Sequence, residues 1–246
     1  MASAKMGFSG NALKIIAAIT MLIDHIGVTL LPEISLLRII GRISFPIFAY
    51  MIAEGCYYTR NKIRYFGGIF ILGVTCQLVY TLYMGDELLG ILITFSISIL
   101  AVYALQYMKE VFASGKGASK KIFSALLFAS AVVGIYFLNE VLYIDYGFFG
   151  CMAPVFASAF KMPRKDKAAA PKNSFLKERL PNVLSLGACL VLLGIAMRGH
   201  QFFALLSLPI LLLYSGRRGK LKMKYFFYVF YPAHLLILEG IYYLIN

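Results

Sequence analysis

The sequence predicts an all-α integral membrane protein, a polytopic bundle of about nine transmembrane helices. Of its 246 residues, 61% are hydrophobic and only 14% are charged, whereas soluble domains carry about 25% charged residues. The mean hydropathy of +0.79 agrees with this. Apolar stretches of about 20 residues, the length that crosses a bilayer, also recur along the chain. We expect a single membrane-embedded domain, residues 1–246.

Nine apolar stretches follow one another, of which the eighth is short. They lie near residues 11–31, 36–58, 63–84, 88–108, 120–139, 143–161, 182–198, 201–215 and 225–245. The connections between them alternate in charge. The basic ones are 60–64, 109–121, 161–179 and 217–224, and the acidic or nearly neutral ones are 31–33, 85–87, 139–145 and 198–200. The positive-inside rule then predicts a multi-pass protein of the cytoplasmic (inner) membrane, with a cytoplasmic N-terminus and an external C-terminus.

The net charge of +13 would suggest a nucleic-acid partner in a soluble protein. Here Lys and Arg fall between apolar runs, where they set topology, so the expected partner is the lipid bilayer and not nucleic acid. No cysteine pair or Cys/His cluster has the spacing of a metal site, so no metal is expected. No connection is long enough to form a cofactor-binding domain, which places any chemistry inside the bundle.

The first span contains two ionisable residues, Asp24 and His25. A charge at the centre of a bilayer costs roughly 2.5–3.5 kcal/mol on insertion scales, so such residues face a bundle interior or a cavity and partner each other. At 1.5 Å per residue, His25, Arg42 and Glu239 each lie about 9 Å below the outer boundary, and Gln77 lies at a similar level. These five residues predict a polar layer in the outer third of the membrane.

Adjacent residues point about 100° apart around a helix. We therefore expect Glu239 to be the partner of His25, and Asp24 to be the partner of Arg42. A purely structural alternative remains, in which Asp24 and His25 form a hydrogen-bonded pair that joins helices. Arg38, near the outer end of the second span, is either part of this layer or an interfacial anchor.

Lys14 lies 11 residues before His25, close to three whole turns, so both residues share one helix face about 16 Å apart. This face carries a cation near the cytoplasmic side and a base towards the outside. It suits a long ligand with phosphates at one end and a reactive group at the other, although Lys14 also fits a residue that snorkels to the interface.

Three further candidates lie in other spans. Glu54, near an inner boundary, is expected to pair with Arg60 or Arg64. His234 follows Pro232 by two residues, and is either a further candidate site residue or a residue that caps or bridges the backbone groups that the proline frees. Asp145 opens the motif DYGFFG at residues 145–150.

Five stretches together resemble the TraX family, from about residue 11 to residue 240. They are LKIIAAITMLIDHIG, RIIGRISFPIFAYMIAEGCYYTRN, DYGFFG, LPILLLYSGRRG and KYFFYVFYPAHLLIL. That family is named for a conjugation protein that acetylates the N-terminus of F-type pilin. A more distant similarity is to transmembrane acyltransferases of the acyltransferase 3 type, whose first helix carries a basic residue, ten residues and then His, as Lys14 and His25 do here.

The resemblance implies an acetyltransferase that uses cytoplasmic acetyl-CoA as acyl donor. His25 would be its general base, a carboxylate of Asp24 or Glu239 would orient the imidazole, and Arg42 or Gln77 would stabilise the oxyanion. Lys14 would contact CoA. The phosphates of CoA would bind basic residues at the inner ends of the spans: Arg60, Lys62, Arg64, Arg217, Arg218 and Lys224. The acceptor would be a pilin-like protein or an envelope glycan.

Two other functions use the same residues. A proton-coupled transporter or flippase of an anionic lipid or small solute would use the buried His, Asp and Arg as a proton relay. A non-catalytic membrane assembly factor would use the polar layer to hold its helices together.

Overall fold

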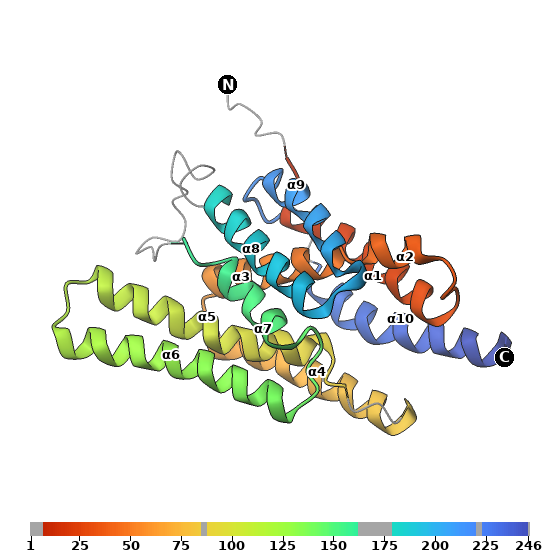
Figure 1. Ribbon diagram of the computed structural model, residues 1–246, viewed down its shortest axis with the longest axis horizontal. Coiled ribbons are helices and arrows are strands. Elements are labelled where there is room, and N and C mark those ends of the chain that lie inside the picture. Colours follow the sequence, from red (N-terminus) through yellow and green to blue (C-terminus); the bar gives the residue numbers. More distant parts are fainter. Residues whose placement is uncertain (1–6, 85–87, 162–178, 220–222, 246) are drawn as a thin grey trace. The chain divides into compact units, whose positions relative to one another are not determined.

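The computed structural model describes residues 7–84, 88–161, 179–219 and 223–245 (Figure 1). These residues are almost entirely helical, and they pack as two compact units. The first unit contains Met1–Met51 and Leu190–Asn246, and the second contains Ile52–Cys189. The candidate residues of the predicted polar layer all belong to the first unit, except Gln77. The predicted single domain over residues 1–246 stays a prediction.

The first unit is built from both ends of the chain. It contains α1 (Gly10–Thr29), α2 (Ser35–Gly41), the start of α3 (Ser44–Tyr58), the end of α8 (Leu180–Met197), the 3-10 helix η2 (Gly199–Leu206), α9 (Ser207–Leu212) and α10 (Lys224–Ile245). The hydroxyl of Ser9 accepts a hydrogen bond from the Ala12 amide and caps α1. Such a cap satisfies one of the amides that a helix start leaves without a partner.

Two glycines allow α1 and α2 to pack closely. A Cβ atom at Gly41 would lie 2.1 Å from Oδ1 of Asp24, and one at Gly27 would lie 2.8 Å from Cβ of Leu37. Small residues are the usual means by which membrane helices approach each other. The side chain of Asp24 therefore occupies the space that any larger residue at position 41 would fill.

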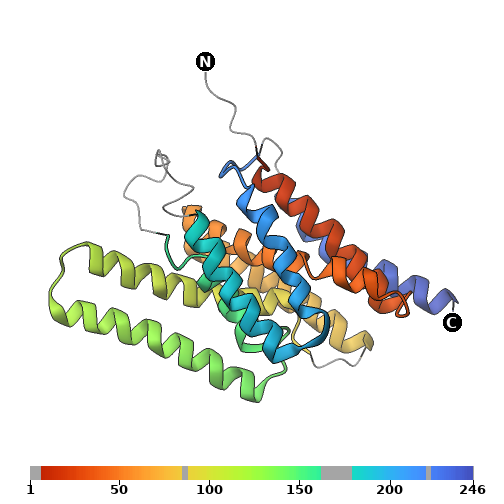
Figure 2. The ribbon, with the colours of Figure 1, turned by 45° about the horizontal axis from the view of Figure 1, so that its top comes forward.

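The helices α1 and α10 run in the same direction (Figure 2). Near the start of both, the Lys14 ammonium lies 5.8 Å from the ring centroid of Phe227, and further along His25 contacts His234. The backbone before α1 also pairs in parallel with the segment before α10, at Phe8 and Tyr214. One face of α1 thus meets α10 over a length of about three turns.

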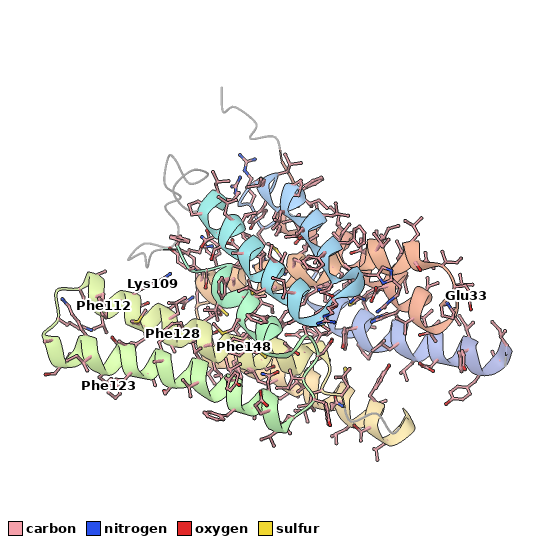
Figure 3. All side chains as sticks on the ribbon, viewed as in Figure 1. Glu33, Lys109, Phe112, Phe123, Phe128 and Phe148 are labelled. Carbon is pink, nitrogen blue, oxygen red and sulfur yellow. The ribbon has the colours of Figure 1, made fainter. Side chains whose placement is uncertain are left out.

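The second unit contains the rest of α3 and of α8, together with four helices of its own: α4 (Lys62–Met84), α5 (Ile91–Ala113), α6 (Ala118–Val141) and α7 (Gly147–Phe156). The antiparallel pair α5 and α6 lies side by side in both ribbon views. Phe112 and Phe123, labelled in Figure 3, expose more than half of their surface on this pair, as expected for side chains that face lipid.

The predicted count of nine spans is not supported. Among the described residues, seven helices are long and apolar enough to cross a membrane, with α2 and α3 taken together as one. Two predicted spans form shorter helices, Gly147–Phe156 for 143–161 and Gly199–Leu212 for 201–215. At 1.5 Å per residue, the ten residues of α7 reach about 15 Å, half of the hydrocarbon thickness.

Local features accompany the short length of these two segments. A hydropathy window records apolar side chains but not the backbone, and both segments carry a proline, Pro154 and Pro209. Before α7, Tyr146 and Gly147 have positive φ values of 60° and 56°, which fix a turn at its start. At its far end the Lys109 ammonium (Figure 3) donates to the carbonyls of Ser158, Ala159 and Lys161, which ends the segment.

Candidate functional site

Asp24 holds two guanidinium groups in the first unit. Its Oδ2 accepts from Nη1 of Arg38 at 2.8 Å and from Nη2 of Arg42 at 2.6 Å, and its Oδ1 accepts from the same Nη2 at 2.7 Å. The predicted pairing of Asp24 with Arg42 is confirmed. Arg38, for which an interfacial role remained open, belongs to the same cluster.

A helix interruption places Arg42. The predicted second span is divided into α2 and α3, and Arg42 follows directly after α2. Pro46 lacks the amide that would otherwise donate to the Arg42 carbonyl four residues earlier, so a continuous helix is disfavoured there. The buried Arg42 side chain turns towards α1, and its Nη1 donates to Oε1 of Gln201 in η2 at 3.2 Å.

His25 meets His234 of α10, and not Glu239 as predicted. Nδ1 of His25 and Nε2 of His234 are 2.7 Å apart. The ring planes differ by 9° and the centroids are 4.9 Å apart, which fits two coplanar rings joined edge to edge through one N–H···N hydrogen bond. On its other side, Nδ1 of His234 lies 2.8 Å from the Phe230 carbonyl, so this residue also bonds the backbone near Pro232, the second role considered for it.

The partners of the two rings fix their tautomers when both are neutral. A carbonyl can only accept, so Nδ1 of His234 carries a proton and its Nε2 accepts. Nδ1 of His25 must then donate to it, which leaves the lone pair of His25 on Nε2. That nitrogen makes no hydrogen bond with any of the described residues. The pair therefore presents one oriented basic nitrogen, as the base in a catalytic triad does.

Two other members of the predicted polar layer have different surroundings. Glu239 is half-buried on α10 and forms no ion pair among the described residues. Gln77 belongs to the second unit, where its Nε2 donates to the Leu88 carbonyl and its Oε1 accepts from the Gly90 amide. Both ends of the Gln77 amide thus hold the connection between α4 and α5.

Basic residues gather at the start of α1. The amides of Gly10 and Asn11 donate to the carbonyls of Arg217 and Arg218, at 2.7 and 3.1 Å, so the backbone fixes this segment against the helix. Both arginine side chains are exposed, whereas Lys14 is half-buried. Of the other predicted CoA contacts, Arg60 and Arg64 are exposed residues of the second unit, and the Lys224 side chain lies outside the described residues.

Glu54 pairs with Lys161, and not with Arg60 or Arg64 as predicted. The Lys161 ammonium bonds Oε1 of Glu54 and lies 4.4 and 4.8 Å from the ring centroids of Tyr57 and Tyr58. Tyr57 and Lys161 are buried in this cluster, which joins the end of α3 to the segment that follows α7. Asp145, the third candidate, lies elsewhere in the second unit. Its backbone carbonyl accepts from the Thr94 hydroxyl, and its backbone amide donates to the Leu89 carbonyl.

Sequence reasoning missed the contact of His234 with His25 and the role of Gln201. Depth along the last span placed Glu239, and not His234, at the level of His25. His234 lies five residues before Glu239 on the same helix. Two imidazole rings joined edge to edge bridge this difference in depth. Gln201 lies next to a predicted external turn, and nothing in its sequence surroundings identifies it.

The comparisons with known proteins give one family model and two similar curated proteins. A model described as TraX protein matches residues 9–242. The chain is similar to the probable fimbrial assembly protein FimC, serogroup H1, of Dichelobacter nodosus, with 25% identity over 255 residues, which cover 96% of both chains. It is also similar to the uncharacterized protein RP591 of Rickettsia prowazekii (strain Madrid E), with 30% identity over 137 residues, which cover 56% of this chain and 50% of that protein. No solved structure matches it. Because the family model spans nearly the whole chain, the protein belongs to the TraX family.

Proposed function

We propose that this protein is an inner-membrane acyltransferase, which transfers an acetyl group from cytoplasmic acetyl-CoA to an amine or hydroxyl acceptor at the outer side. The hydrogen-bonded pair of His25 and His234 carries this proposal. A base that is oriented by a second group, with its free nitrogen turned away from that group, is the arrangement that general-base catalysis needs.

In the proposed step, Nε2 of His25 removes a proton from the acceptor as the acceptor attacks the thioester carbonyl. The carbon–sulfur bond breaks when the tetrahedral intermediate collapses, and the imidazolium returns the proton to the leaving CoA sulfur. His234 is a positioning residue, because it orients the ring of His25 and touches no reacting atom. Stabilisation of the oxyanion by Arg42 or Gln77 stays a prediction.

The proposed donor path follows the shared face of α1 and α10. Lys14, Arg217 and Arg218 lie at the start of α1, and Lys and Arg side chains bind phosphate groups well. His25 lies 11 residues further along α1, about 16 Å away. The nucleotide of CoA would bind among these cations, with its pantetheine arm extended towards His25.

The acceptor is proposed from the family and from its relatives. The name of the Dichelobacter nodosus relative refers to fimbrial assembly, so the N-terminus of a pilin-like protein is the first acceptor to test, and an envelope glycan is the second. Both are presented at the outer side of the membrane, towards which His25 is predicted to lie.

Release of free CoA from acetyl-CoA by the purified protein in lipid nanodiscs tests the chemistry. We expect His25→Ala to lower the rate by about 10²–10⁴-fold, the usual contribution of a general base. His200→Ala is the matched control, because His200 is exposed. Equal rates in the wild type and His25→Ala would contradict the proposed base.

His234→Phe tests the positioning role separately. Phenylalanine keeps an aromatic ring against Phe230, whose ring lies parallel to that of His234, but it removes the hydrogen bond to His25. We expect kcat to fall while the affinity for CoA stays unchanged, since no proposed CoA contact is altered. A loss of CoA affinity with an unchanged kcat would contradict this role.

The same histidine pair would also suit proton transfer in a transporter, the second candidate function. A hydrogen-bonded imidazole pair inside a membrane bundle is a typical element of a proton relay. Binding of acetyl-CoA separates the two functions, because a proton-coupled transporter of a lipid or small solute has no use for it.

A further inference from the structure

The cluster around Asp24 is arranged like a partly filled anion site. Asp24, Arg38 and Arg42 together contribute one negative and two positive charges. Both guanidinium groups are held by the same carboxylate, which fixes their orientation. Guanidinium groups are the preferred partners of carboxylate and phosphate oxygens, to which they donate two parallel hydrogen bonds.

Gln201 adds a donor to this cluster. Its side chain is buried, with 4% of the residue surface exposed, and its Nε2 is buried without a hydrogen-bond partner. The amide cannot be reversed, because the atom that faces Nη1 of Arg42 at 3.2 Å must be an acceptor. Nε2 is bonded to the same carbon as that oxygen, so it lies beside the Arg42 guanidinium. A buried donor without a partner costs about 1–3 kcal/mol, which an added acceptor would recover.

The backbone before Gln201 is held in an unfavourable conformation. Arg198, three residues earlier, has φ 58° and ψ −166°, a combination that residues other than glycine rarely adopt and that costs of the order of 1–3 kcal/mol. Gly199 follows with φ 58°. These two residues begin η2, and they direct the buried Gln201 towards α2.

We propose that Arg38, Arg42 and Gln201 bind a singly charged oxyanion, a carboxylate or phosphate group, on the acceptor that reacts beside His25. This rests on the proposed function, and it adds that the acceptor is acidic. Arg38 keeps 29% of its side chain exposed, so the group reaches the cluster from that side. Asp24 adjoins His25 in the chain and their side chains point about 100° apart around α1, so an acceptor anchored at the cluster lies on the helix face next to that of the base.

Anion binding is measured without any acyl donor, so that its failure is separate from a failure of catalysis. The full chain in a neutral detergent is titrated with sodium phosphate or sodium acetate against sodium chloride at equal ionic strength. Unfolding is followed with a thiol-reactive dye, which reports the four cysteines, Cys56, Cys76, Cys151 and Cys189, as they become accessible. At a tenfold excess over Kd we expect the melting temperature to rise by about 3–6 °C.

Three glutamine variants make the test specific. Gln201→Leu removes the donor, and we expect it to lose more than half of the anion-dependent rise. Gln201→Glu supplies its own carboxylate to Arg42, and we expect it to melt at a higher temperature without anions and to respond little to them. Gln106→Leu is the matched control, because Nε2 of Gln106 is also buried without a partner among the described residues, and it should respond like the wild type.

The source of the anion is distinguished by a second titration, in nanodiscs of phosphatidylcholine with increasing phosphatidylglycerol. If free phosphate or acetate raises the melting temperature of the wild type more than that of Gln201→Leu, the anion is a soluble or protein-borne group. If only phosphatidylglycerol raises the melting temperature of the wild type more than that of Gln201→Leu, the anion is a lipid headgroup. If the wild type and Gln201→Leu respond equally in both titrations, or if neither responds, the proposed site is wrong.

Discussion

Loss of the Asp24 charge should destabilise the first unit more than loss of either arginine that it binds. Asp24 lies between Arg38 and Arg42, and its side chain is only 11% exposed. Asp24→Asn keeps the shape but leaves two guanidinium groups beside a neutral amide. Breaking a buried ion pair by removal of one partner costs about 3–5 kcal/mol.

The two arginines should differ because they differ in burial. Arg42 keeps 10% of its side chain exposed and Arg38 keeps 29%. We expect Arg42→Gln to approach the cost of Asp24→Asn. Arg38→Gln should cost about 1 kcal/mol or less, because solvent screens partly exposed pairs. The double variant Asp24→Asn with Arg42→Gln should cost less than the sum of the single variants, since the two residues interact directly.

The assay is thermal unfolding in detergent with the thiol-reactive dye. For a chain of this length, 1 kcal/mol corresponds to about 2–4 °C in Tm. Asp24→Asn should therefore melt about 6–20 °C below the wild type, and Arg38→Gln no more than about 4 °C below it. Equal melting of Asp24→Asn and the wild type would refute the buried cluster, and a loss in Arg38→Gln as large as in Arg42→Gln would refute the ranking by burial.

Three further predictions concern packing, CoA binding and topology. Gly41→Ala places a Cβ against the Asp24 carboxylate and should lower the free energy of unfolding by about 1–3 kcal/mol. In the control Gly240→Ala the added Cβ has nothing within 4 Å, so this variant should stabilise the protein by up to about 1 kcal/mol. Equal melting temperatures of the two variants would contradict the close approach of α1 and α2. Lys14→Ala should weaken CoA binding in isothermal titration, and unchanged affinity would exclude Lys14 from the donor path. A reporter fused at Asn246 should read as external, because α1 and α10 run in the same direction and the N-terminus is predicted to be cytoplasmic; a cytoplasmic reading would contradict this predicted orientation.

Apolar stretches of about 20 residues predicted most of the helices, because a transmembrane helix needs little more than length and hydrophobicity. It did not predict how they are interrupted. Pro46 divides the second predicted span at Arg42, and Pro154 lies in one of the two shortened segments. A proline within an apolar run is tolerated when neighbouring groups satisfy the backbone, so its effect depends on tertiary contacts that the sequence does not reveal.

Charge pairing in the site was predictable where a single geometric rule applied. The 100° step between Asp24 and His25 correctly directed Asp24 towards Arg42. The rule of equal depth failed for Glu239, because side chains several ångströms long connect positions more than a turn apart, as His25 and His234 do. Depth along a helix is thus a weaker guide to contacts than direction around it.

Two contacts that depend on the local course of the backbone could not be predicted, whereas the bond of His234 to the backbone near Pro232 was among the roles expected for it. Gln77 was expected in the polar layer, but its amide bonds the backbone of Leu88 and Gly90. Gln201 became a candidate only because η2 directs it to Arg42. Both outcomes depend on the local course of the chain, which composition and spacing leave undetermined.

The most direct test of acetyl transfer through His25 is mass spectrometry of envelope proteins and glycans from cells that produce either the wild type or His25→Ala. Both proteins are first brought to equal abundance in the membrane, and cells without the protein serve as the baseline. The account predicts a species heavier by one acetyl group in wild-type cells alone. The same acetylated species at equal abundance in His25→Ala cells would contradict it.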